Sequence, residues 1–192
     1  MYVLPADICR LCRNATSEDI CSWSFGAIVK ESQDEPVTWP TAKGTLDDEG
    51  IFGPIVDFEC SCRKYVGPQY IDHVCDICGV KIASRHDRRT RFGHINLSVP
   101  ITHDVCGGTE RIDAFPVLPA HLRRSAGGSG LNSLYEKMLR GSNNRNAISV
   151  REAYHEICAL VGPIVTVAVE WMLQEAPVLA RGLGLVLVIG DE

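Results

Sequence analysis

The stretch CSCRKYVGPQYIDHVCDIC, residues 60–78, decides the fold of the middle of this chain. It contains a C-x-C pair, Cys60 and Cys62, and a C-x-x-C pair, Cys75 and Cys78, separated by a loop of 12 residues. Four thiolates in two close pairs can converge on one tetrahedral cation, as in a closed structural zinc site. We therefore predict a zinc ribbon in which these four cysteines bind one Zn²⁺ ion.

Two features next to this stretch agree with a structural metal site. Gly79 follows the second pair, where a tight turn benefits from a residue that tolerates positive φ. Four cysteine ligands leave no open coordination position, so hydrolytic chemistry at this metal is not expected. The alternatives are buried cysteine packing and a redox dithiol, which the paired spacing disfavours. A segment this small gains little from its own core, and zinc binding, worth about 10 kcal/mol or more, would supply most of its folding energy.

A second cysteine pair is less specific. Cys9 and Cys12 form another C-x-x-C, and further ligands could come from Cys21, Cys106 or His103. Nothing in the spacing selects among them, so a second zinc site and a pair of free, partly buried thiols both stay open.

Composition limits the classes of protein that fit. The chain has 192 residues and is 45% hydrophobic, enough for one ordinary core or two small units and too apolar for a disordered tail. Nineteen basic and 24 acidic residues give a net charge of −5, so the surface as a whole does not attract nucleic acid. The first residues lack the pattern of a secretory signal. We therefore expect a cytoplasmic protein whose nine cysteines bind metal rather than form disulfides.

Positive charge is concentrated directly after the cysteines, in KIASRHDRRTRFGHI (residues 81–95). Arginine and lysine at this density can contact nucleic-acid phosphates, although a solvated charged face is the commoner fate of such runs. We predict a nucleic-acid-binding strip, called the basic strip below, formed by Lys81, Arg85, Arg88, Arg89 and Arg91.

The sequence divides into three parts, and we expect a small α+β protein. Residues 1–50 are a lead-in segment, residues 51–105 carry the zinc ribbon with short strands and the basic strip, and residues 106–192 are a helical region that contains a C-terminal helical hairpin. The first helix of the hairpin is predicted from an apolar stripe at i, i+3, i+4, i+7 and i+8. This stripe consists of Leu131, Leu134, Tyr135, Met138 and Leu139.

The second helix of the hairpin has a predicted start and a predicted interruption. Ser149 and Glu152 fit a capping box, and Gly162-Pro163 should break or kink the helix. The apolar run IVTVAVEWML that follows is ambiguous between helix and strand. It is shorter than a membrane span and carries Glu170, so we expect a buried core element and no membrane contact.

With these motifs, the chain resembles the N-terminal, zinc-binding and clamp region of the bacterial RNA polymerase beta-prime subunit. The resemblance runs through residues 15–30, 50–65 and 74–103, and resumes at FPVLPAHLRRS, GLNSLYEKML and WMLQEA. It implies a zinc-binding role for the four cysteines, a function in transcription, DNA contact through the basic strip, and polymerase core subunits or sigma factor as partners.

The departures from the family pattern imply a shortened, non-catalytic module. Between His103 and Phe115 the family has a long helical insertion that forms much of the clamp, and here about a dozen residues replace it. The stretch SAGGSG (residues 125–130) stands for a longer family loop, and we expect it to be a flexible connection. The family's NADFDGD motif, which holds catalytic Mg²⁺, is absent, so this chain cannot polymerise RNA alone.

Three functional hypotheses remain at this point. The first is a beta-prime-like clamp and zinc-binding module that acts in transcription and binds DNA and polymerase partners without its own catalytic centre. The second is a free-standing, zinc-stabilised regulator or decoy that binds RNA polymerase or sigma factor. The third is an unrelated zinc-stabilised interaction domain, against which the continuity of the resemblance on both sides of the ribbon argues.

Overall fold

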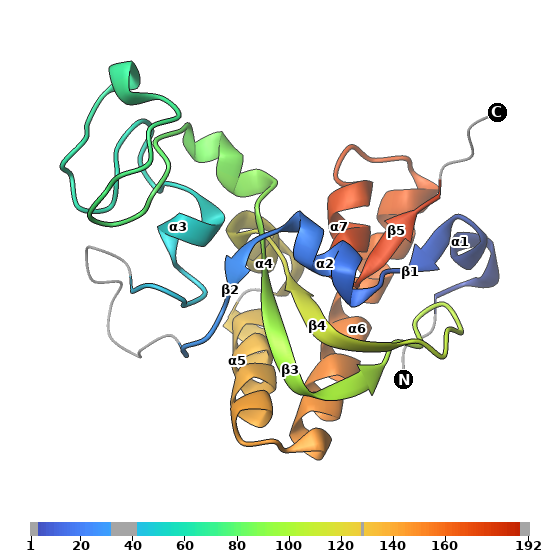
Figure 1. Cartoon of the computed structure of the whole chain (residues 1–192). Coiled ribbons are helices and arrows are strands. Elements are labelled where there is room, and N and C mark those ends of the chain that lie inside the picture. Colours follow the sequence, from blue (N-terminus) through green and yellow to red (C-terminus); the bar gives the residue numbers. More distant parts are fainter. Residues whose placement is uncertain (1–3, 32–41, 128, 189–192) are drawn as a thin grey trace.

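The computed structural model describes residues 4–31, 42–127 and 129–188, which form the mixed α+β fold expected from the sequence (Figure 1). The helices of the described part are α1 (Ala6–Arg10), α2 (Ser17–Trp23), α3 (Glu49–Phe52), α4 (Ala120–Gly127), α5 (Ser129–Asn143), α6 (Ala147–Glu170) and α7 (Ala176–Gly182). The strands are β1 (Cys12–Asn14), β2 (Ser24–Ala27), β3 (Phe92–Thr102), β4 (Arg111–Val117) and β5 (Leu185–Leu187). One 3-10 turn, η1 (Pro68–Tyr70), lies in the cysteine-rich segment, and a second, η2 (Arg85–Arg89), follows it.

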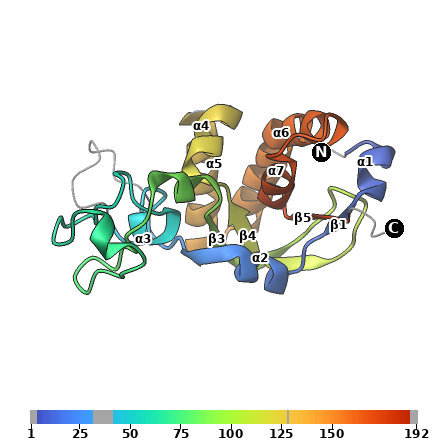
Figure 2. The same ribbon diagram turned by 90° about the horizontal axis from the view of Figure 1, so that it is seen from above.

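A three-stranded sheet in the order β2-β3-β4 forms the centre of the body. β2 runs parallel to β3, and β3 pairs antiparallel with β4 in a register that sets Ile95 opposite Phe115. Helices α5, α6 and α7 lie on one side of this sheet and α2 lies on the other (Figure 2). A separate two-stranded sheet pairs β1 with β5, so the beginning and the end of the described chain lie side by side.

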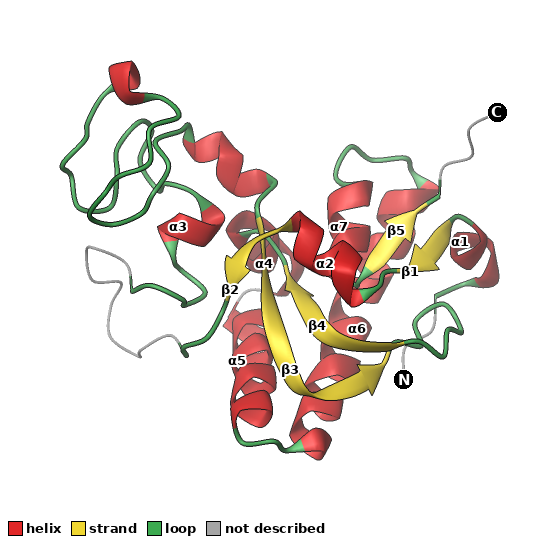
Figure 3. Cartoon of the chain, viewed as in Figure 1, coloured by secondary structure: helices red, strands yellow, loops and turns green. Residues whose placement is uncertain are grey.

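The cysteine-rich segment, which carries residues 60–78, projects from one end of the body (Figure 1) and consists almost entirely of loops (Figure 3). It is also called the projecting segment or the metal segment below. The short strands expected there are isolated antiparallel bridges, Glu59–Val66 and Val74–Lys81. β3, which we assigned with this segment, pairs with β4 across the expected boundary between residues 105 and 106. The division into three parts stays a prediction.

The C-terminal helical hairpin is present as α5 packed against α6. All five residues of the apolar stripe on α5 are buried. The preceding stretch, residues 125–130, was expected to be a flexible connection. Instead, α4 extends to Gly127 and α5 begins at Ser129, so helical structure replaces that connection on both sides of residue 128.

For the second helix of the hairpin, the expected cap was wrong, and of the expected break or kink at Gly162-Pro163 the break was wrong. The N-cap of α6 is Asn146, whose side chain accepts a hydrogen bond from the Ser149 amide at 3.2 Å, so Ser149 lies inside the first turn. Pro163 lies within α6 and does not end it, because the helix continues to Glu170 with Val165, Ala168 and Val169 buried. Tertiary packing of this apolar face outweighs the cost of an interior proline.

The length and composition of α6 alone would allow it to cross a membrane. It is the one such helix among the described residues, and half of its most apolar window is buried inside the fold. It occupies the position of a core helix, in contact with α5, α7 and β3.

A buried arginine joins the body to the base of the cysteine-rich segment. Arg123 on α4 is 2% exposed, and its guanidinium stacks on the Phe52 ring of α3 at 4.7 Å. It donates hydrogen bonds to the Leu118 carbonyl and the Asn132 side chain, both at 3.0 Å, and to the Leu46 carbonyl. Burial lowers the pKa of Arg123 to about 10, which still leaves the group charged at neutral pH.

We predict that Arg123→Leu destabilises the protein by about 3 kcal/mol or more, because it leaves two buried carbonyls and the partly buried Asn132 side chain without their donor. Urea unfolding followed by circular dichroism measures the free energy of unfolding. The neighbouring Arg124 is exposed, and Arg124→Leu should change this free energy by less than about 0.5 kcal/mol. Equal effects of the two substitutions would contradict the bonding role of Arg123.

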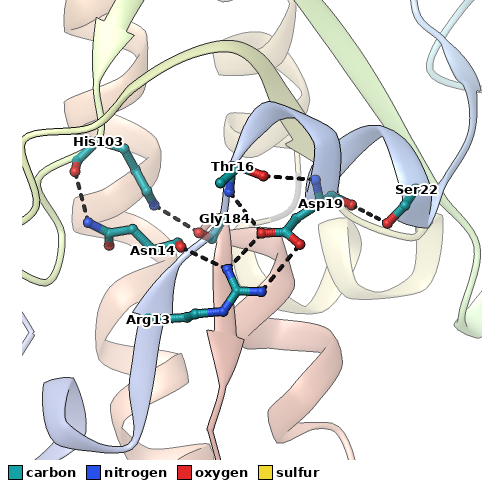
Figure 4. A network of polar contacts seen from close by, with 7 residues as sticks. All are labelled: Arg13, Asn14, Thr16, Asp19, Ser22, His103 and Gly184. Atoms are coloured by element: carbon teal, nitrogen blue, oxygen red, sulfur yellow. Dashed lines mark hydrogen bonds and ion pairs between the residues drawn. The ribbon is translucent and has the colours of Figure 1, made fainter.

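A polar network ties the N-terminal segment to the C-terminal one (Figure 4). His103 is fully buried and its Nε2 lies 2.9 Å from the Gly184 carbonyl oxygen, which also accepts a hydrogen bond from the Ala15 amide at 2.7 Å. The Asn14 side chain donates to the His103 carbonyl at 3.1 Å. The network therefore holds β1, the end of β3 and the start of β5 together, and His103 has a structural role in it.

The same figure shows how α2 begins. Thr16 and Asp19 form a capping box, and the Asp19 carboxylate also accepts a hydrogen bond from Arg13 at 2.7 Å. The hydrogen bond from Arg13 and then that from the Thr16 amide lower the pKa of Asp19 to about 2.

Because the pKa of Asp19 is depressed in the folded state, its contribution to stability is present above the ordinary aspartate pKa and is lost as the pH falls towards 2. We predict that Asp19→Asn lowers stability near neutral pH by roughly 0.5–1 kcal/mol, the pair with Arg13 being partly exposed. Thermal unfolding at a series of pH values should show this difference shrinking between about pH 5 and pH 2. A difference that does not depend on pH would show that the carboxylate charge is irrelevant.

Candidate metal centre

Two tight turns bring the four cysteines together at the end of the projecting segment. In the first, the Cys60 amide donates to the Tyr65 carbonyl at 3.2 Å and the Tyr65 amide donates back to Cys60 Sγ at 3.3 Å. In the second, the Cys75 amide donates to the Val80 carbonyl at 3.0 Å and the Gly79 amide to the Cys75 carbonyl at 2.8 Å. Gly79 has φ of +77°, as the position after the C-x-x-C pair predicts.

The sulfur atoms of Cys60, Cys62, Cys75 and Cys78 all lie within 4.8 Å of one another. Cys62 Sγ is 3.7 Å from Cys60 Sγ and 3.5 Å from Cys75 Sγ, and all four thiols are free of disulfides. Sulfurs bound at about 2.3 Å to a tetrahedral zinc stand about 3.8 Å apart. The cluster thus has the donor set and the spacing of a four-thiolate metal site, with the sequence-predicted ligands and no others.

Backbone hydrogen bonds adjust the acidity of these thiols. Burial raises the pKa of Cys75, but the amides of Cys78 and Ile77 outweigh it and bring the value to about 7. The Lys64 amide favours the Cys62 thiolate, yet burial and the neighbouring thiols together raise its pKa to about 12. A cation at the centre would favour the thiolate form of every ligand, because metal binding displaces thiol protons.

The projecting segment has little apolar core of its own. Its cluster of buried residues consists of Cys60, Cys75, Val80 and Ile82, two of which are candidate ligands. Several other apolar side chains of the segment are half exposed, among them Val66, Ile71, Val74 and Ile77. A metal ion bound by the four cysteines would therefore supply stability that a hydrophobic core otherwise gives.

The basic strip does not form a continuous surface. Lys81 pairs with Asp72 at 2.7 Å, and Arg91 is 5% exposed, with its guanidinium 3.1 Å from Asp87 and over the Phe25 ring. The remaining three arginines of the strip, Arg85, Arg88 and Arg89, lie together on η2 and line one pocket.

The α4 side of that pocket was not identified from the sequence. His121 and Arg124, on α4, line it opposite η2. They lie in the FPVLPAHLRRS stretch, far along the chain from the basic strip, and only the fold brings the two segments into contact.

The second cysteine pair does not assemble into a comparable cluster. Cys12 is buried and Cys9 half buried, with Cys9 Sγ 3.6 Å from the Leu4 carbonyl oxygen. Cys106 lies beside them, and burial followed by contact with the Cys9 thiol raises the pKa of Cys106. In the part of the chain that the structure describes, no group of three or more metal-ligating side chains other than the four cysteines has suitable spacing.

Comparison with known proteins identifies relatives for about half of the chain. A segment of 89 residues is 45% identical to proteins named DNA-directed RNA polymerase subunit beta' from Lactobacillus delbrueckii subsp. bulgaricus, Lactobacillus helveticus and Leuconostoc citreum. The segment covers 46% of this chain but only 7% of each relative. No family model matches the chain. The resemblance to the beta-prime subunit seen in the sequence is confirmed over this segment.

We predict that the purified chain contains one metal ion and that Cys75→Ser abolishes its binding and the order of the projecting segment. Elemental analysis measures the stoichiometry, and amide hydrogen exchange reports loss of protection around the two turns. Cys21 is exposed, so Cys21→Ser is the matched control and should keep the metal. A protected, metal-free segment in the wild-type chain would contradict the metal site.

Proposed function

We propose that this chain acts in transcription as a beta-prime-like clamp and zinc-binding module without a catalytic centre of its own. The observation that carries the proposal is the 45% identity to RNA polymerase beta' subunits over 89 residues. The convergence of four thiols at zinc-like spacing is in accord with it. The chain spans a small part of the length of these relatives, so the polymerase reaction itself is not proposed for it.

In this proposal the metal is Zn²⁺ and its role is structural. Cysteine sulfurs are ligands that zinc prefers, and four of them complete a tetrahedral shell with no position left for substrate or water. The ion would hold the two turns in one arrangement and thereby fix the segment between them. The module would then present a rigid surface in spite of its small core.

The module would contact DNA through η2, directly after the metal segment. Arg85 and Arg89 are exposed there, while Arg88 is partly buried against the Gly53 carbonyl. Phosphate contacts of this kind are independent of sequence and depend on salt. Lys81 and Arg91 are already held by neighbouring groups and would contribute less.

The partners of the module would be RNA polymerase core subunits or sigma factor, and its location would be the cytoplasm. The resemblance to a subunit of that enzyme supports these partners. Half-exposed apolar side chains on the metal segment, such as Ile77, agree with a protein partner there.

A second candidate function, a free-standing regulator or decoy, rests on how the body closes upon itself. Where the family carries its clamp insertion, β3 and β4 form a closed hairpin with Thr102 opposite Arg111. β5 pairs with β1 and completes the body from this chain's own residues. Such a closed body can bind a polymerase from outside without serving as one of its parts.

Affinity purification of the tagged, zinc-loaded chain, followed by identification of the bound subunits, tests the proposal. Recovery of core subunits without inhibition of transcription by added chain would support the subunit-like module. Recovery of core or sigma factor with inhibition would support the regulator. Recovery of neither core subunits nor sigma factor, by the wild type and by the control variant Cys21→Ser alike, would overturn both candidate functions.

A further inference from the structure

The pocket between η2 and α4 has a volume of about 390 Å³. η2 contributes Arg85, Arg88 and Arg89, and α4 contributes His121 and Arg124. Two elements separated by about thirty residues of sequence thus direct basic side chains to one concave site.

The charge of the pocket wall is unbalanced. Four arginines line it against one carboxylate, Asp47. Arg85 is 3.5 Å from Asp57, and Arg88 donates to the Gly53 carbonyl.

The other two arginines of the pocket differ from Arg85 and Arg88 in this respect. Arg89 and Arg124 are exposed, and neither forms an ion pair with a carboxylate within residues 4–31, 42–127 and 129–188. One lies on each wall of the pocket, so their charges face the same space from both sides.

The titration of groups in the wall reflects this excess of positive charge. Burial and then the Arg89 guanidinium lower the pKa of His121, and Arg124 acts in the same direction, while a hydrogen bond to the Arg88 backbone and the charge of Glu175 oppose them. Burial lowers the pKa of Arg88, with Arg124 and Arg91 adding to the effect against Glu49 and Asp47. An anion in the pocket would relieve the repulsion among these cations.

His121 also has unused hydrogen-bonding capacity. Its Nδ1 is buried and has no hydrogen-bond partner in the described part of the chain. A buried polar nitrogen without a partner is costly, and a ligand oxygen within reach would satisfy it.

We propose that this pocket binds a phosphate group, held by Arg89 from η2 and Arg124 from α4, with Arg85, Arg88 and His121 around it. Tetrahedral phosphate oxygens accept hydrogen bonds from several guanidinium groups at once, a geometry that a single surface lysine does not provide. The inference rests on the proposed DNA contact. It narrows the contacting surface from the basic strip to a pocket formed by η2 and α4. The phosphate is that of a nucleic-acid backbone or of a free polyphosphate, and the experiment separates the two.

The test uses the full, zinc-loaded chain with two probes, a labelled DNA duplex and inorganic pyrophosphate. Arg124→Gln and Arg89→Gln should each weaken binding close to tenfold at about 0.1 M salt and reduce the slope of log K against log salt by about one. Lys81→Gln removes an equal charge from the same basic strip outside the pocket and should change binding less than about twofold. Fluorescence anisotropy follows the duplex, and calorimetry follows pyrophosphate.

Each outcome assigns or overturns the pocket. Loss of duplex binding in the pocket variants, with weak competition by pyrophosphate, identifies the nucleic-acid backbone as the source. Tight pyrophosphate binding that Arg124→Gln abolishes, without duplex binding, identifies a free polyphosphate. Equal effects of Lys81→Gln and Arg124→Gln, or binding of neither probe, overturn the pocket. Because no polymerase is present, failure here is distinct from failure of the affinity purification.

Discussion

The position of the metal segment relative to the body depends on the buried guanidinium of Arg123. This guanidinium, carried by α4, contacts Leu118 two residues before that helix, and Phe52 and Leu46 at the base of the metal segment. A planar group with five donors suits this place, since lysine could neither stack in the same way nor supply as many fixed directions. Arg123 thereby holds α4 against α3 and the residues that precede α3.

The body and the projecting segment are stabilised by different interactions. The body buries a continuous core that extends from Leu4 to Leu185 and includes both faces of the sheet. The projecting segment has a hydrophobic cluster of only four buried residues and many loops, and in our proposal metal coordination orders it. Body and segment meet at α3, where Glu49 is fully buried and accepts a hydrogen bond from the Ile55 amide. This difference predicts that loss of metal would leave the body folded.

Local patterns were sufficient to predict some of this structure. The four cysteines and the stripe on α5 depend on spacing within a few turns of chain, and both are found where the sequence places them. The cap of α6, the passage of that helix through Pro163 and the burial of Arg91 were missed, because packing from distant segments decides them. The α4 side of the basic pocket was missed for the same reason, since Arg124 reaches η2 only through the fold. The preceding residue, Arg123, is a buried structural arginine, and no sequence pattern distinguishes it from Arg124.

The pairing of β1 with β5 has a consequence for how the chain is made. Cys12 pairs with Leu187, so β1 is synthesised long before the strand with which it pairs. During synthesis β1, with the His103 network that depends on Gly184, stays unmatched until β5 has emerged. The four cysteines and the turn that closes at Val80 lie close together in the sequence and can assemble on the nascent chain long before. Folding would therefore begin at the cysteines, and the sheet of β1 and β5 would form last.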